Sequence, residues 1–192
     1  MRQMYRALLV AIVAVTWLGC SGSSSGPSSA GSTLNVMIKD APFADAKAVL
    51  VTFSEVSAHV SGAGGFTVLP FSGGGTTRTC DLKKLATSQD VLGTGTLAAG
   101  HYTQIRLVVT SAVLYFDNAS AGPACAAAIV APAGLSAQIG VSSGDIKLNR
   151  EFDVTASGAT TILVDFDGNQ SIHIEGNGTY MMSPVIAVVS VQ

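Results

Sequence analysis

The stretch Val49-Leu-Val-Thr-Phe-Ser-Glu-Val-Ser-Ala-His-Val60 decides the fold class of this chain. Its apolar side chains occupy alternate positions, first Val49, Val51 and Phe53 and then, after a change of phase, Val56, Ala58 and Val60. Alternation with a period of two is typical of a β-strand that has one buried face. A shift of one position inside a single long strand predicts a β-bulge near Ser54-Glu55.

The same alternation recurs along the rest of the chain. It is found over residues 34–38, 105–115, 162–166 and 185–191, and a shorter run at 66–71 contains Pro70 and is expected at a sheet edge. Turns rich in Gly and Ser separate the runs at 61–65, 72–75, 142–144 and 157–158. Several short strands divided by such turns predict an all-β sandwich. At most one short helix is expected, after Asp81, which would cap the segment Leu82–Ala86.

The first nineteen residues have the layout of an export signal. Arg2 and Arg6 supply the basic start, an apolar run follows up to Leu18, and small residues precede a cysteine. The apolar run is about 12 residues long, whereas a helix that spans a bilayer needs roughly 20. We therefore expect residues 1–19 to be a signal peptide that is removed, not a permanent transmembrane anchor.

Cys20 is predicted to be the site of lipid attachment. The end of the signal, Trp17-Leu-Gly-Cys20, resembles the lipobox of bacterial lipoproteins, although Leu18 stands one position late. The other interpretation is an ordinary secretory signal with a chance cysteine. Residues 20–32 favour lipidation, because a flexible Gly/Ser-rich tether would hold a folded domain off a membrane. The expected location is the bacterial cell envelope, and Ser21 after the cysteine resembles the sorting pattern for the outer membrane.

Length and charge restrict the number of domains and the class of partner of the chain that follows the signal peptide. The chain has 192 residues, and residues 33–192 are expected to form one domain that buries a proper core. Without the signal, eight basic residues face twelve acidic ones, a net charge of about −4. No basic cluster is present in the sequence, and hence nucleic acid is not an expected partner.

Three cysteines remain in the mature chain. If Cys20 carries lipid, Cys80 and Cys125 form an even pair in a compartment that permits disulfides. A disulfide between them is the favoured prediction, and two buried free thiols are the alternative.

Three stretches taken together resemble a known family. They are Leu34-Asn-Val-Met-Ile-Lys-Asp-Ala-Pro42 with the strand after it, Leu97-Ala-Ala-Gly-His-Tyr-Thr-Gln-Ile-Arg-Leu107, and Leu163-Val-Asp-Phe-Asp167 continuing to Ile186. In this order they are similar to the bacterial lipoprotein family known as domain of unknown function 4382. The middle stretch also resembles transthyretin-like and carboxypeptidase-regulatory-like sandwiches. The resemblance implies an antiparallel Greek-key sandwich of seven or eight strands, of immunoglobulin or prealbumin type, and it brings no catalytic residue or ligand.

Asp165, Asp167 and Asn169 form the best acidic cluster. Period two places Asp165 and Asp167 on one face of a strand, and their oxygens with that of Asn169 suit calcium, which takes six to eight oxygen ligands. Asp40 or Asp45 would be needed to contribute across space. The alternative is a turn at a strand end, where Asp and Asn bond their own backbone.

Catalysis is not expected, and a hydrolase is a less favoured alternative. Gly140-Val-Ser-Ser-Gly144 fits the pattern G-x-S-x-G, but a strand-like segment follows it where hydrolases have a helix. His59, His101 and His173 are scattered along the strands, whereas zinc sites usually cluster their ligands. The sequence therefore predicts a non-enzymatic binding or structural module, anchored to a membrane by lipid, with an envelope protein or a surface polysaccharide as its partner. A calcium-dependent glycan or small-ligand binder is the alternative function, and no other cofactor is expected.

Overall fold

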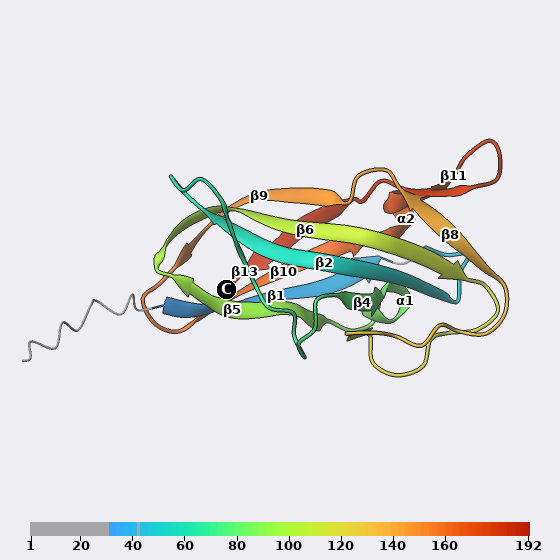
Figure 1. The fold of residues 1–192 in the computed structure, drawn as a ribbon, viewed down its shortest axis with the longest axis horizontal. Helices are drawn as coiled ribbons and strands as arrows, with labels where there is room; N and C mark the ends of the chain where they lie inside the picture. The colour runs from blue at the N-terminus through green and yellow to red at the C-terminus, as the bar shows by residue number, and fades with distance from the viewer. Residues whose placement is uncertain (1–30, 42) are drawn as a thin grey trace, which may run out of the picture.

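The computed structural model describes residues 31–41 and 43–192, which fold into two β-sheets packed face to face (Figure 1). The all-β sandwich predicted from the alternating pattern is confirmed. The signal peptide, Cys20 and most of the predicted tether lie outside the described residues. The first strand begins at Gly31, and so the last two residues assigned to the tether are part of the sheet. Among the residues described, no helix is long and apolar enough to cross a membrane.

The smaller sheet has four strands in the order β13-β10-β1-β5. Their bounds are β1 (Gly31–Ala41), β5 (Asp90–Ala98), β10 (Ala159–Asp167) and β13 (Ile186–Val191). β1 and β10 run parallel, whereas the other two pairings are antiparallel. The sheet is therefore mixed, which differs from the expected antiparallel arrangement.

The larger sheet is built on two long strands, β2 (Ala48–Val60) and β6 (Gly100–Tyr115). Seven shorter strands complete it: β3 (Phe66–Val68), β4 (Arg78–Asp81), β7 (Cys125–Ala126), β8 (Ser136–Val141), β9 (Asp145–Val154), β11 (Ile172–Ile174) and β12 (Tyr180–Met182). The described residues thus form more strands than the seven or eight expected. Of the five strands that are only two to four residues long, β3 falls in the short run predicted at 66–71, whereas β4, β7, β11 and β12 are too short for a periodic pattern to be recognised.

The pairing of β2 with β6 contains the bulge that the sequence predicts. Phe53 lies opposite Val109 and Glu55 lies opposite Val108, so Ser54 is left without a partner in the ladder. The bulge explains why the apolar phase changes there, because one extra residue restores the following side chains to the buried face. Both halves of β2 consequently face the same core.

Aliphatic and aromatic side chains from the inner faces of the two sheets make up the core. Phe53 of β2 and Phe166 of β10 are fully buried and meet edge to face, with ring centroids 6.4 Å apart. Tyr102 packs against Phe152 and donates its hydroxyl to the backbone oxygen of Ala98. This contact fixes the turn between β5 and β6, where Gly100 begins the strand.

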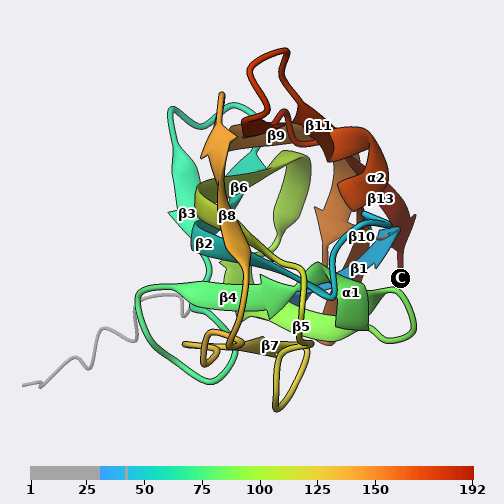
Figure 2. The same cartoon turned by 90° about the vertical axis from the view of Figure 1, so that its right-hand side faces the viewer.

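Two short helices lie at one end of the sandwich. α1 (Leu82–Leu85) is capped by Asp81, whose side chain accepts from the backbone N–H of Lys83, as the sequence predicts. α2 (Gly168–Ser171) follows β10 directly and was not expected. Figure 2, which looks at this end, shows both helices there; we call it the α1 end. The opposite end, where the described chain starts, is the Gly31 end (Figure 1).

The predicted disulfide is confirmed. Cys80 in β4 and Cys125 in β7 are directly opposite each other in an antiparallel pair, and their sulfur atoms are 2.02 Å apart. Both residues are buried, at the edge of the larger sheet. The bond therefore ties the long connection between β6 and β8 to the core of the domain.

Replacing Cys80 and Cys125 together with alanine should destabilise the domain. The bond closes a loop with a sequence separation of 45, and loss of this restraint on the unfolded chain corresponds to about 4 kcal/mol. Denaturant unfolding of both forms would measure the difference. A double variant whose free energy of unfolding lies within about 1 kcal/mol of the wild type would contradict this expectation.

Candidate functional site

Asp165, the first of the predicted calcium ligands, is held in an ion pair. It lies on β10, and its Oδ2 is 2.6 Å from Nζ of Lys39 on the neighbouring strand β1. Both side chains are roughly one-third exposed. Oδ2 of Asp165 is therefore already bonded to the ammonium group of Lys39.

Asp167 and Asn169 have local roles at α2. The side chain of Asp167 accepts the backbone N–H of Gln170 at 2.9 Å and also accepts from the side-chain amide of Gln170. This is the N-cap arrangement that satisfies a free amide at the start of a helix. Asn169 is exposed in the same turn.

The three predicted ligands are therefore neighbours, but other contacts already use two of them. In residues 31–41 and 43–192, no group of three or more His, Cys, Asp or Glu side chains is arranged to hold a metal ion. Calcium binding at Asp165, Asp167 and Asn169 stays a prediction.

Asp40 is a further acidic residue beside this cluster, and it is nearly buried. Period two places it on the inner face of β1 with Leu34, Val36 and Ile38, and only 7% of its surface is exposed. Its Oδ1 accepts the backbone N–H of Gly168 at 2.9 Å. A Cβ atom at Gly168 would come within 3.1 Å of Oδ1, so a residue without a side chain allows α2 to approach so closely. Oδ2 is buried and has no hydrogen-bond partner in the described part of the chain.

Burial raises the pKa of Asp40 to about 7. The negative charges of Asp165 and Asp167 act in the same direction, while the N–H of Gly168 and the charge of Lys83 lower the pKa. Desolvation dominates because a carboxylate loses more solvation on burial than a neutral carboxyl group does. Near neutral pH, Asp40 is therefore present in both protonation states.

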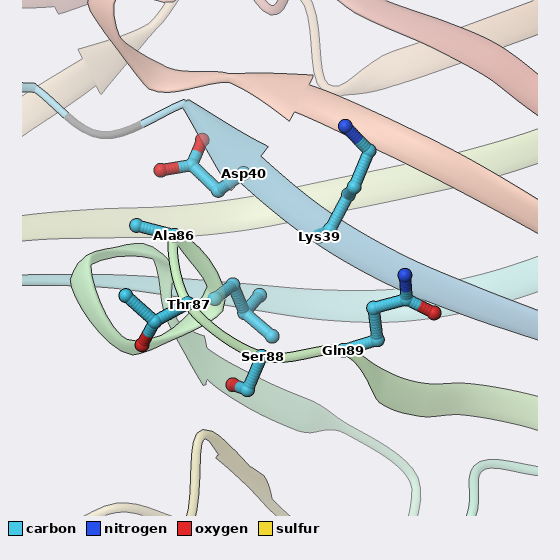
Figure 3. Close-up of a pocket in the computed structure, with 7 residues that line it drawn as sticks. Lys39, Asp40, Ala86, Thr87, Ser88 and Gln89 are labelled. Carbon is cyan, nitrogen blue, oxygen red and sulfur yellow. The ribbon is translucent and has the colours of Figure 1, made fainter.

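An open hollow lies beside Asp40 at the α1 end. Its volume is about 490 Å³, and it is lined by Lys39, Asp40, Leu85, Ala86, Thr87, Ser88 and Gln89. Figure 3 shows the segment Ala86–Gln89 across the hollow from the last part of β1. The lining is mostly polar.

The backbone explains why a hollow forms at this place. The pairing of β1 with β5 ends at Ile38 opposite Asp90, whereas the pairing of β1 with β10 continues to Ala41. On the β5 side, the edge of β1 is therefore free over its last three residues. Residues 86–89, which connect α1 to β5, do not pair with this edge of β1 and line the opposite side of the hollow.

A second feature at the α1 end is the connection between β6 and β8, residues 116–135, which we call the pinned loop. Asp81 holds its base: the carboxylate accepts the hydroxyl of Ser120 at 2.6 Å, and its backbone N–H donates to the oxygen of Ala124 at 2.7 Å. Asp90 accepts the backbone N–H of Cys125 at 3.0 Å. These contacts lie next to the disulfide.

The far part of the pinned loop is also fixed. Asp117 accepts the backbone N–H of Leu135 at 2.6 Å, and Asn118 donates to the oxygen of Ala133 at 2.8 Å. Between these contacts Gly134 has a φ of 103°, a conformation that glycine adopts without strain. The loop therefore has a defined shape without a helix or long strand of its own.

Apart from Asp117 at its start, the pinned loop is uncharged and its surface is largely apolar. Val130 is 83% exposed and Leu135 is 64% exposed. No charged residue occurs between Asp117 and Asp145 in the sequence. A small apolar hollow of about 210 Å³ lies on the loop, lined by Ala121, Gly122, Pro123, Ala126, Ala128, Ile129 and Val130. Figure 2 shows the loop at the bottom of the α1 end, in yellow.

The serine and the histidines considered for catalysis each bond to other groups. The hydroxyl of Ser142 donates to the oxygen of Met182 at 3.0 Å and is 3.2 Å from that of Ser183. The partners of His59, His101 and His173 are Thr103 and Ala63, Asp153, and Glu175 respectively. Within the described ranges, none of these histidines forms a hydrogen bond with a serine.

Comparison with known proteins gives one family. A model described as "Domain of unknown function (DUF4382)" matches residues 31–184, which is the greater part of the chain. No curated protein and no solved structure matches.

Asp40→Asn should stabilise the domain above neutral pH. The pKa is 3.8 for an unperturbed Asp and about 7 for the folded state, so the folded form binds the proton more tightly and stability falls as pH rises between these values. The asparagine cannot ionise and avoids this loss, which is at most about 4 kcal/mol at pH 8. Unfolding free energies at pH 4 and pH 8 should differ less for the variant than for the wild type. Asp45→Asn, at an exposed position nearby, is the control, and an equal effect in both variants would refute the assignment.

Two substitutions separate the capping role of Asp167 from a calcium role. Asp167→Ala should lower the free energy of unfolding by about 0.5–2 kcal/mol, whereas Asp167→Asn should have little effect, because asparagine is also a good N-cap. Thermal midpoints would be measured with and without millimolar calcium. If calcium raises the midpoint of the wild type and both substitutions abolish the rise, the calcium prediction is right and capping is not the main role.

Proposed function

The chain belongs to the DUF4382 family of domains of unknown function, and from this premise we propose that it is a lipid-anchored binding module of the bacterial cell envelope. In this proposal Cys20 carries the lipid, the outer membrane holds it, and the sandwich binds another envelope protein without catalysing a reaction. The binding surface is the pinned loop.

The proposed anchor is supported by the sequence, and the direction of β1 bears on which end of the domain would face outward. The basic start, the apolar run and Cys20 are the parts of a lipoprotein signal. β1 begins eleven residues after Cys20 and runs away from the Gly31 end (Figure 1). Eleven residues of strand extend about 35 Å, so an anchor at Cys20 would leave the α1 end further from the membrane by about that length. The pinned loop would then face outward.

The observation that carries the binding role is the rigidity of an exposed apolar surface. Val130 and Leu135 are mostly exposed, yet a disulfide, the buried carboxylate of Asp81 and the partly buried carboxylate of Asp90 fix the loop that bears them. An ordered loop loses little conformational entropy when it binds, and exposed apolar patches on a rigid scaffold mark interaction sites. The absence of charge over residues 118–144 suits a partner surface that is also uncharged.

The contacts of Ser142 support a role without catalysis. Its hydroxyl is bonded to a backbone oxygen and lies near another serine, whereas a serine nucleophile needs a base to remove its proton. This arrangement suits a turn between β8 and β9.

Site-specific crosslinking in intact cells tests the proposal. A photoreactive amino acid would replace Val130 in the pinned loop, and a second strain would carry it at Val68, which is 59% exposed on β3. We expect one reproducible protein adduct from position 130 and not from position 68. Mass spectrometry would identify the adduct.

Cys20→Ala supplies the anchoring control for the same experiment. We expect this variant to leave the membrane fraction and to lose the adduct at position 130. Unchanged membrane association would contradict the lipid anchor. Equal adducts at positions 68 and 130, or none at either, would contradict binding through the pinned loop.

A further inference from the structure

We propose that Asn177 is a glycosylation site, whose side-chain nitrogen accepts an oligosaccharide from a lipid-linked diphosphate donor. Of the function proposed above, this inference uses only the export of the chain to the cell envelope, because glycosylated asparagines are surface positions of exported proteins. It depends neither on the pinned loop nor on calcium.

The sequence contains three triplets of the form Asn-x-Ser/Thr, which begin at Asn118, Asn169 and Asn177. This triplet is the acceptor sequence for glycosylation of an asparagine side chain, and it combines an amide with a hydroxyl group two residues later. A transferase can use a folded acceptor only where both groups are exposed. The structure therefore distinguishes the three triplets.

The hydroxyl groups of the first two triplets are buried and already bonded. Ser120 is 7% exposed, and its hydroxyl donates to the carboxylate of Asp81. Ser171 is completely buried; its hydroxyl donates to the backbone oxygen of Asp167 and accepts the backbone N–H of Val185. An enzyme cannot reach either hydroxyl without unfolding the segments that hold it.

The third triplet lies in the turn of the hairpin between β11 and β12, and residues 175–179 are all exposed. Figure 1 and Figure 2 show this hairpin projecting from the α1 end. Oδ1 of Asn177 accepts the backbone N–H of Thr179 at 3.0 Å and its hydroxyl at 2.6 Å. Within residues 31–41 and 43–192, Nδ2 of Asn177 forms no hydrogen bond. The turn thus engages the amide oxygen and leaves free the nitrogen that would carry the sugar.

Two glycines give the third triplet the space that a glycan and an enzyme need. A Cβ atom at Gly176 or Gly178 would have no heavy atom within 4 Å apart from those of its chain neighbours. Glycine adopts a wide range of backbone conformations, and Gly178 already has a φ of 83°. The hairpin turn can therefore change shape in a transferase without strain.

Glu175, two positions before Asn177, adds a carboxylate beside the acceptor. Its side chain is half exposed and contacts only the equally exposed ring of His173 among the described residues. An arginine of a transferase can bind such a carboxylate through two hydrogen bonds. Asp167 has the same spacing from Asn169, but its oxygens accept from Gln170.

The transfer is a substitution at the anomeric carbon of the donor sugar. The lone pair of Nδ2 forms the new bond to this carbon, while the bond from the carbon to the diphosphate oxygen breaks. The diphosphate leaves with the electron pair of that bond, and one proton of Nδ2 passes to a base of the transferase. Nothing is oxidised or reduced, and the side chain stays an uncharged amide.

Mass spectrometry of the full chain, isolated from the bacterium that encodes it, tests the proposal. Trypsin releases residues 151–192 as one peptide, because no Lys or Arg follows Arg150, and this peptide contains both Asn169 and Asn177. We expect it to carry an added mass of saccharide composition, which fragmentation that preserves the glycan places on Asn177. An unmodified peptide, or sugar attached to Asn169, a serine or a threonine, would overturn the proposal.

Substitutions in the hairpin check the assignment. Asn177→Gln and Thr179→Ala should each abolish the modification, whereas Thr179→Ser keeps the hydroxyl and should retain it. Glu175→Gln should lower the modified fraction several-fold, because it removes the charge that an arginine would bind. Asn169→Gln is the matched control and should change nothing. Sugar that persists in Asn177→Gln, or is lost equally in Asn169→Gln, would refute the site, and thermal midpoints check that each variant is folded.

The same spectra report on the lipid anchor independently, through the mass of the N-terminal peptide that begins at Cys20. An unmodified Asn177 in a chain whose Cys20 carries lipid would contradict the glycosylation alone. A glycosylated Asn177 in a chain without lipid would support the glycosylation and contradict the anchor alone.

Discussion

The arrangement of the α1 end depends on the carboxylate of Asp81. It is completely buried and accepts from the backbone of Val49 in β2, from the backbone of Lys83 in α1 and from the hydroxyl of Ser120 in the pinned loop. Three segments that are distant in the sequence thus share one side chain. Buried charged groups are stable only when they are well bonded, and so this network specifies a single arrangement of the segments. The disulfide, one residue before Asp81, strengthens the same junction.

The sequence predicts what depends on local pattern. Period two predicted β1, β2, β6, β10 and β13 but not β5 or β8, the phase change after Phe53 predicted the bulge, and the capping residue before Leu82 predicted α1. With Cys20 assigned to the lipid, the two remaining cysteines, Cys80 and Cys125, predicted the disulfide. The parallel pairing of β1 with β10 was missed because alternation says which face is buried but nothing about strand direction. The spacing of Asp167 and Gln170 matches a capping box, which is a signal for α2, but the same residues also fit a turn or a calcium site, and the local pattern does not decide between them.

The candidate sites were harder to predict, for physical reasons. Asp40 is in phase with the buried residues of β1, which is a readable signal, but its burial depends on α2 covering it from the other end of the sequence. The hollow exists because the pairing of β1 with β5 stops before the end of β1. The register of two strands depends on both of them, so the sequence of one strand does not predict where their pairing ends. The pinned loop is rich in Ala, Gly and Pro, a composition that suggests flexibility. Its order comes from contacts at its base, made by residues more than thirty positions away.

The position of β1 has a mechanical consequence. A force transmitted from the N-terminal side to a load held at the α1 end would act along the axis of β1. Because β1 has partners on both sides, β10 and β5, its hydrogen bonds would be loaded together in shear and not opened one after another like a zipper. Strands arranged in this way yield only when many bonds break at once. The geometry of β1 therefore favours resistance to extension along its axis, which in the proposed arrangement is the direction of tension between the membrane and a partner bound at the α1 end.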